Sequence, residues 1–135
     1  MRQIAYRLRP GELLKESIEQ KAIDESIGAG VLLSIVGGVK KAVLRMAGSE
    51  AHNSVVKTWD DQFEIVAGTG TISKDGCHIH VALSDRDGKV IGGHLKDGCI
   101  VEFTCEIVVG IFDDVVFERR ADEDTKFNEL NVIAV

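Results

Sequence analysis

The spacing of apolar residues near the start of the chain follows a strand-like period. Ile4, Tyr6 and Leu8 lie at every second position over residues 3–9, and Arg7 and Arg9 occupy positions on the other face. A period of two is typical of a strand with one buried face. We therefore predict a half-buried strand that ends at Pro10-Gly11.

The period changes to that of a helix over residues 12–27. Leu14, Ile18 and Ala22 are spaced by four, and Glu, Lys and Gln residues occupy the positions between them. This spacing predicts an amphipathic helix with one apolar face packed on a sheet. Gly28 and Gly30 are predicted to close it.

The remainder of the chain has the pattern of strands and turns. Gly37-Gly38 is predicted to separate the first two strands, residues 48–61 to form a loop around a minor strand, and the later strands to form a meander. The apolar tail, 130–135, is predicted to dock on its own sheet or on a neighbouring one. The predicted strands cover residues 31–36, 41–46, 63–73, 77–84, 90–95, 99–111 and 115–119.

Three similar turn sequences punctuate this region. Lys74-Asp75-Gly76-Cys77 recurs as Lys96-Asp97-Gly98-Cys99, and Arg86-Asp87-Gly88-Lys89 is a near copy. Asp-Gly between alternating segments is a strong hairpin signal. We therefore predict turns at all three places.

Composition and charge narrow the class of protein. The 135 residues are 44% hydrophobic and 5% aromatic, which predicts one compact domain over 1–135 with an aliphatic core. The net charge of −6 and the lack of a basic cluster make autonomous DNA binding doubtful. Three cysteines, with no apparent leader or membrane segment, predict a cytoplasmic protein with free thiols.

Three of the four histidines lie within one predicted hairpin. His78 and His80 share the face of their strand opposite to the aliphatic Ile79 and Val81, roughly 7 Å apart along the backbone. If Arg86-Asp87-Gly88 is a three-residue loop, counting outward from it places His80 opposite His94. Three imidazoles with one open position are typical of a catalytic zinc site.

The same pattern has a simpler interpretation. The histidines could belong to a polar sheet face on which they hydrogen-bond to neighbours or water, and a register shift of one residue would separate His94 from the other two. His52 lies in a polar loop and is left out of the site. The spacing alone therefore leaves two alternatives, a metal site and a polar face.

The other candidate chemical groups are weaker. Cys77, Cys99 and Cys105 alternate onto aliphatic faces and are predicted to be small buried hydrophobes. Glu106 is the better candidate for a partly buried carboxylate that orients a histidine or acts as an acid or base, and Glu64 is a second. Pairing of Glu106 with an arginine, for which Arg45 is one candidate, is the alternative.

Six segments together resemble one protein family, the plant- and prokaryote-conserved (PPC) domain, which is found alone in bacteria and archaea and beside AT-hooks in plants. They are Leu8-Arg9-Pro10-Gly11-Glu12, Phe63-Glu64-Ile65-Val66, Gly68-Thr69-Gly70-Thr71-Ile72-Ser73, Asp75-Gly76-Cys77-His78-Ile79-His80, Gly92-Gly93-His94-Leu95 and Glu106-Ile107-Val108-Val109. The resemblance implies an α+β domain, a strongly bent antiparallel sheet packed on one helix, that assembles as a homotrimer.

The resemblance also implies functions. Family members are often described as DNA-binding proteins, but this chain has no Arg-Gly-Arg AT-hook core, and a trimer would carry three times the net charge of −6. The fold is similar to that of acetolactate decarboxylase, whose zinc is held by a His-x-His pair and a later histidine. His78, His80 and His94 match that pattern.

We therefore expect a homotrimeric protein of this family that binds zinc or another divalent transition metal through His78, His80 and His94. A regulatory module that binds DNA or a protein and a metal-dependent enzyme acting on a small-molecule ligand are the alternatives. If the protein is such an enzyme, Glu106 or Glu64 would act as the proton shuttle.

Overall fold

The helix and the strands follow the predicted change in apolar spacing. A computed structural model describes all residues, 1–135. One helix, α1 (Leu14–Asp24), lies between the first two strands, and the α+β class is confirmed. The strands are β1 (Arg2–Leu8), β2 (Gly30–Arg45), β3 (Val56–Trp59), β4 (Phe63–Ser73), β5 (Gly76–Ser84), β6 (Val90–Leu95), β7 (Ile100–Ile111), β8 (Val115–Ala121) and β9 (Asn128–Ala134).

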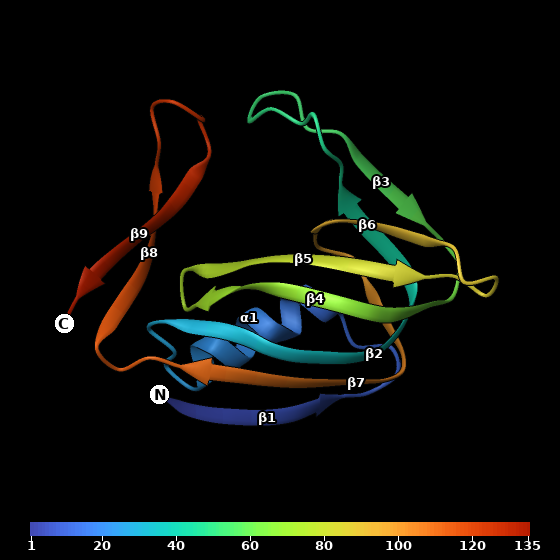
Figure 1. Cartoon of the computed structure of the whole chain (residues 1–135), viewed down its shortest axis with the longest axis horizontal. Helices are drawn as coiled ribbons and strands as arrows, with labels where there is room; N and C mark the ends of the chain where they lie inside the picture. The colour runs from blue at the N-terminus through green and yellow to red at the C-terminus, as the bar shows by residue number, and fades with distance from the viewer.

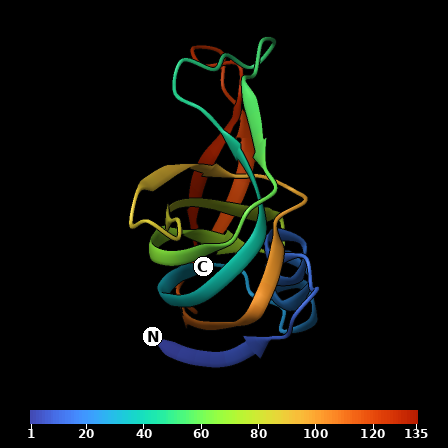
Figure 2. The ribbon, with the colours of Figure 1, turned by 90° about the vertical axis from the view of Figure 1, so that its right-hand side faces the viewer.

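Seven strands form one antiparallel sheet in the order β1-β7-β2-β4-β5-β6, and β3 pairs with the end of β2 (Figure 1). The sheet is strongly bent, as expected, so that the far end of β2 also pairs with β6 (Figure 2). There Arg45 lies opposite His94. The predicted meander is wrong, because β7 does not pair with β6 and instead lies between β1 and β2.

The last two strands form a separate hairpin. β8 pairs with β9 alone, and in Figure 1 this hairpin stands at one end of the molecule beside the turn between β4 and β5. The apolar tail therefore pairs with β8, the strand before it in the chain, in a small sheet beside the main one. This is one of the two predicted arrangements. The backbone N–H of Phe117 donates to the carbonyl of Gly28, which ties the hairpin to the segment that leads from α1 into β2.

The prediction that Gly37-Gly38 ends a strand is wrong. β2 continues through both glycines, and its partner on β7 shifts from Cys105 to Glu102 between them. Gly37 has a φ of +152°, and a Cβ at this position would collide with the backbone of Thr104. The two glycines therefore bend the strand at a bulge instead of stopping it.

The core lies between α1 and the sheet. α1 buries Leu14, Ile18 and Ala22, as its spacing predicted, and packs against β4 and β5. Along β5, Ile79 and Val81 are buried whereas the histidines point away from the core. The chain contains no helix that is both long and apolar enough to span a membrane.

Candidate metal centre

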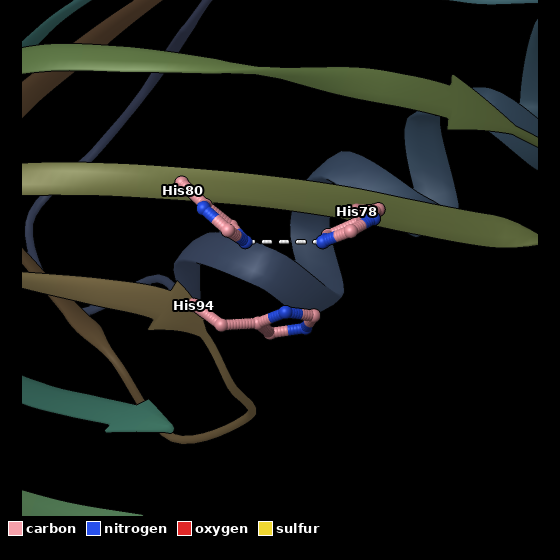
Figure 3. Close-up of side chains that lie close together, drawn as sticks. All are labelled: His78, His80 and His94. Carbon is pink, nitrogen blue, oxygen red and sulfur yellow. Dashed lines mark hydrogen bonds between the residues drawn. The ribbon is translucent and has the colours of Figure 1, made fainter. Parts of the chain in front are cut away.

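The β5–β6 hairpin brings the three histidines together. Its register places Ser84 opposite Val90 and His80 opposite His94, as counting from the turn predicted. His78 lies two residues before His80 on the same strand face. The three rings therefore form a triangle on the face of the sheet that is turned away from the core (Figure 3).

The turn that sets this register is held by one aspartate. The backbone N–H of Asp85 donates to the carbonyl of Lys89 at 2.8 Å, and the Asp85 carboxylate accepts from the N–H groups of Asp87 and Lys89 at 2.9 Å each. Gly88 supplies the φ of +79° that the third loop position requires. The sequence Asp-Arg-Asp-Gly thus specifies the turn that positions His80 opposite His94.

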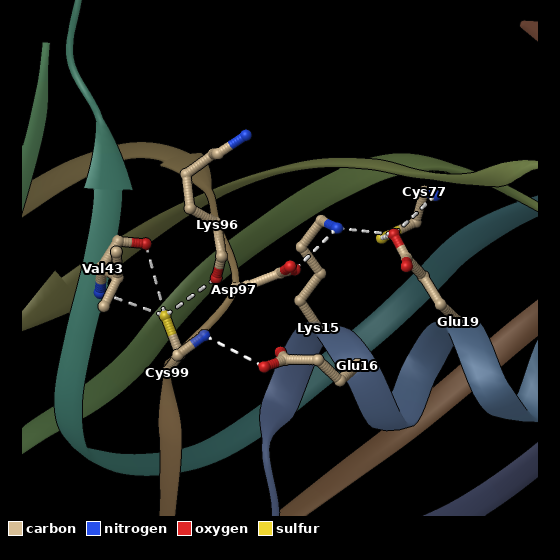
Figure 4. Close-up of polar contacts among 9 residues, drawn as sticks. Lys15, Glu16, Glu19, Val43, Cys77, Lys96, Asp97 and Cys99 are labelled. Carbon is tan, nitrogen blue, oxygen red and sulfur yellow. Dashed lines mark hydrogen bonds and ion pairs between the residues drawn. The ribbon is translucent and has the colours of Figure 1, made fainter. Parts of the chain in front are cut away.

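The helix braces the other ends of both histidine strands (Figure 4). The Glu19 carboxylate accepts from the backbone N–H of Cys77 at 3.4 Å, and the Glu16 carboxylate accepts from the N–H of Gly98 at 3.1 Å. Lys15 pairs with Glu19 at 2.6 Å and with Asp97 at 3.0 Å. The repeated Lys-Asp-Gly-Cys turns, one before β5 and one after β6, are therefore both docked on α1.

The ring nitrogens are close enough to share one ion. Nε2 of His78 and Nε2 of His80 are 3.0 Å apart, and one nitrogen from each of the three rings lies within 4.8 Å of the others. The ring centroids of His94 and His78 are 4.7 Å apart. His78 and His94 are half-buried and His80 is exposed, so the cluster is open on one side.

The surroundings keep two of the rings neutral. Burial, followed by the charge of the Arg45 guanidinium, lowers the pKa of His94 to about 3. Burial, followed by the neighbouring His80 and Arg119, lowers the pKa of His78. A metal binds the neutral imidazole. The donor set therefore fits a divalent transition metal: three nitrogen ligands, a Zn²⁺ preference for imidazole, and a free coordination position.

Arg45 contacts His94 directly. Its Nη2 atom donates to Nδ1 of His94 at 3.1 Å, and its guanidinium lies 4.7 Å from the ring centroid of Phe127 on the hairpin. The sequence suggested Arg45 only as a partner for Glu106. Its position beside the cluster follows from the β2–β6 pairing, which no local pattern indicated.

Comparison with known proteins identifies the family. The model of the Plants and Prokaryotes Conserved (PCC) domain, written PPC above, matches residues 1–113. The chain belongs to this family. A curated relative, the bifunctional protein GlmU of Synechococcus sp. (strain JA-3-3Ab), is 35% identical over 132 residues, which are 98% of the chain but 21% of that protein. The chain thus spans about a fifth of the length of such relatives.

A plant relative is named for the AT-hook, the motif that the resemblance led us to expect beside this domain in plants. The AT-hook motif nuclear-localized protein 8 of Arabidopsis thaliana is 28% identical over 106 residues, 72% of this chain and 26% of that protein.

Several solved structures share the fold. A hypothetical protein from Salmonella cholerae-suis superimposes with a TM-score of 0.91 at 28% identity, covering 98% of this chain and 94% of that one. The metal-containing protein AF0104 from Archaeoglobus fulgidus is 32% identical, with a TM-score of 0.84 and coverage of 97% and 94%. A Staphylococcus aureus protein similar to alpha-acetolactate decarboxylase, at 17% identity and a TM-score of 0.55, shares the fold over 82% of this chain and 52% of its own.

The two carboxylates singled out from the sequence lie elsewhere on the PCC domain. Glu106 is exposed on β7 opposite Arg7, and β2 and β4 separate β7 from the histidine strand. Glu64 is exposed on β4 opposite Ser84. Neither hydrogen-bonds to a histidine. The expectation that Glu106 is partly buried is therefore wrong, because its face of β7 is turned to solvent in the chain.

A hollow of about 330 Å³ adjoins the cluster. His78 and His94 line one side, and Arg119 and Phe127 of the β8–β9 hairpin line another. The whole hairpin lies beyond the residues matched by the PCC model. Arg119 was not among the site residues predicted from the sequence. Which side chains of the hairpin reach the cluster depends on contacts between segments far apart in the chain.

Proposed function

We propose that this PCC-domain protein binds a divalent transition metal, Zn²⁺ in the first instance, through His78, His80 and His94. The observation that carries the proposal is the convergence of three ring nitrogens within 4.8 Å, on a hairpin whose register is fixed by its turn. A polar face made only for solvation does not require imidazoles that point at one another. The metal-containing relative at 32% identity supports the same interpretation.

The open side of the cluster favours a catalytic role over a closed structural one. Three protein ligands leave a position for water or substrate, and the hollow beside His78 and His94 gives a small molecule access to it. A metal in this position would supply Lewis-acid chemistry or an activated water. A metal-dependent enzyme acting on a small molecule is therefore the second, more specific proposal.

Metal content tests the first proposal. Protein purified without a metal-affinity step is incubated with Zn²⁺ and dialysed, and bound metal is measured by mass spectrometry for wild type, His80→Ala and His94→Ala. We expect about one ion per chain in wild type and at least tenfold weaker binding in both variants. His52→Ala, the fourth histidine, is the matched control and should bind as wild type does. Equal, negligible metal in wild type and His80→Ala would refute the site.

We further propose that the chain is a cytoplasmic homotrimer. Exposed aliphatic side chains on the sheet support assembly: Leu33 is 49%, Val36 is 50% and Val66 is 56% exposed. Three free cysteines are in keeping with a reducing compartment. Light scattering should give a mass three times the 14.7 kDa of one chain. A monomer mass at micromolar concentration would exclude the trimer.

A further inference from the structure

We propose that the hollow beside the histidines binds a small oxyanion, the carboxylate or phosphate group of a metabolite, through Arg45, Arg119 and Lys96. The metal-dependent part of this inference rests on the proposed function. The pocket itself is built from side chains that are present whether or not a metal is bound.

The first argument is charge. Arg45, Lys96 and Arg119 line the hollow, are only half exposed, and form no salt bridge with a carboxylate. The fourth cation of the hollow, Lys15, differs because Glu19 and Asp97 both pair with it. Partly buried cations without counter-charges raise the local potential and attract anions.

The three carboxylates around the hollow offset the charge of its four cations only in part. Of the three, Glu19 is held by Lys15, Asp75 is exposed, and Glu129 accepts from the hydroxyl of Thr125 at 3.2 Å. No acidic side chain belongs to the histidine cluster itself. A dication held by three neutral imidazoles would therefore lie beside two guanidiniums, and no protein ligand would neutralise its charge. A bound anion would neutralise it.

The second argument is geometry. Arg119 donates from Nη2 to the hydroxyl of Thr71 at 2.8 Å, and Thr71 lies opposite His78 on the neighbouring strand. Arg45 is held over the ring of Phe127 and reaches His94. Each guanidinium is thus held next to the cluster, that of Arg119 through the partner of His78 and that of Arg45 through His94. A fixed guanidinium offers paired N–H donors, which match the oxygens of a carboxylate or a phosphate.

The third argument couples the oxyanion to the metal. An arginine only donates, so Nδ1 of His94 accepts from Arg45 and the proton of the neutral ring lies on Nε2. Ligation through Nδ1 uses the lone pair that accepts this bond. Ligation through Nε2 moves the proton to Nδ1, which then faces a second donor. Either way the Arg45–His94 contact is lost, and the N–H of Arg45 becomes available to an oxyanion.

Volume limits the ligand. A hollow of about 330 Å³ is at the lower end of the range for small-molecule sites. It suits a metabolite with a few carbon atoms and one or two acidic groups, and it is too small for an oligonucleotide or a folded peptide.

The test uses Co²⁺-loaded protein, because the visible spectrum of Co²⁺ reports changes at the metal, with inorganic phosphate and acetate as separate probes. Calorimetry of the metal-free protein is run in parallel with the same two anions. The variants are Arg45→Gln and Arg119→Gln. Arg120→Gln is the matched control, since Arg120 is exposed next to Arg119, pairs with Glu118, and does not line the hollow.

We expect at least one anion to shift the Co²⁺ spectrum, with an apparent Kd about tenfold weaker in Arg45→Gln and Arg119→Gln and unchanged in Arg120→Gln. The anion that does so identifies the acidic group. Anion binding to metal-free wild type should be weaker than to loaded protein, because Arg45 is then engaged by His94.

Two results obtained with the Co²⁺-loaded protein would overturn the inference. One is no response to either anion in wild type. The other is the same concentration dependence in all the proteins, which would mean that the anion contacts the metal alone. If Co²⁺ does not bind at all, the proposed function fails separately. Calorimetry of the metal-free protein then still decides the pocket: binding that Arg119→Gln weakens supports it, and no binding refutes it.

Discussion

Gly70 on β4 is the residue whose replacement should most directly disturb the histidine strand. It lies opposite Ile79, between the pairs Thr69–His80 and Thr71–His78. A Cβ built on Gly70 would lie 2.8 Å from the Cα of Ile79 and closer still to the carbonyl oxygen of His78. Real Cβ atoms essentially never approach below 3.0 Å, and both neighbours are backbone. Gly70→Ala must therefore push β5 away from β4.

The magnitude follows from what must move. Overpacking a tight site costs about 1–3 kcal/mol. Separating the strands also weakens the ladder hydrogen bonds on each side of the new methyl group, at about 1 kcal/mol each. We expect Gly70→Ala to lose about 3–5 kcal/mol of unfolding free energy, which is a large part of the stability of an ordinary domain.

Gly28→Ala is the matched control. A Cβ on Gly28 would meet only a methyl group of Val116, at the ordinary contact distance of 3.8 Å, and its φ is not in the left-handed region. This variant should stay within about 1 kcal/mol of wild type. Urea unfolding followed by circular dichroism measures both variants, and Zn²⁺ uptake at low urea should fall in Gly70→Ala alone. A difference between them below about 1 kcal/mol would show that β5 absorbs the methyl group, and the reasoning would fail.

Four further predictions address the turn, the thiols, the histidine environment and DNA. Asp85→Ala removes the acceptor of two backbone N–H groups, so it should destabilise the protein by about 1–2 kcal/mol and weaken Zn²⁺ binding, and wild-type affinity would contradict this. Burial raises the pKa of Cys77 and Cys105 to about 12 and raises the pKa of Cys99, so a thiol reagent at pH 8 should label none of them quickly in folded protein and all three in denaturant. The pKa of His94 is lowered from 6.5 to about 3 in the fold, so its contribution to the stability of metal-free protein is complete above pH 6.5 and is lost as the pH falls toward 3. In His94→Gln the free energy of unfolding should therefore fall less steeply between pH 6.5 and pH 3. The same slope in wild type and variant would refute the assignment. The net charge of −6 predicts no DNA retardation in a gel shift at near-physiological salt, and tight binding there would reverse the charge argument.

The ligand set of the candidate site could be predicted because it is local. Only the period of a strand and the length of one turn were needed to place His80 opposite His94, and both are properties of a few neighbouring residues. The helix was predictable for the same reason, since its apolar face repeats every four residues. The bulge at Gly37-Gly38 could not be predicted, because a glycine pair in a strand-like segment is equally compatible with a break in the strand and with a bend.

The charges around the histidines could not be predicted from local patterns. Arg45 lies near the cluster because the far end of β2 pairs with β6, and Arg119 lies there because it belongs to the β8–β9 hairpin, which follows the last strand of the main sheet. Arg45 and His94 are 49 positions apart in the sequence, and Arg119 and Thr71 are 48 positions apart. The local hairpin therefore determines which residues form the proposed metal site, and the long-range topology determines which charges lie beside it. If the chain is an enzyme, its choice of substrate depends on that second, non-local set, and variants of Arg45 and Arg119 should change ligand preference while leaving the three histidines in place.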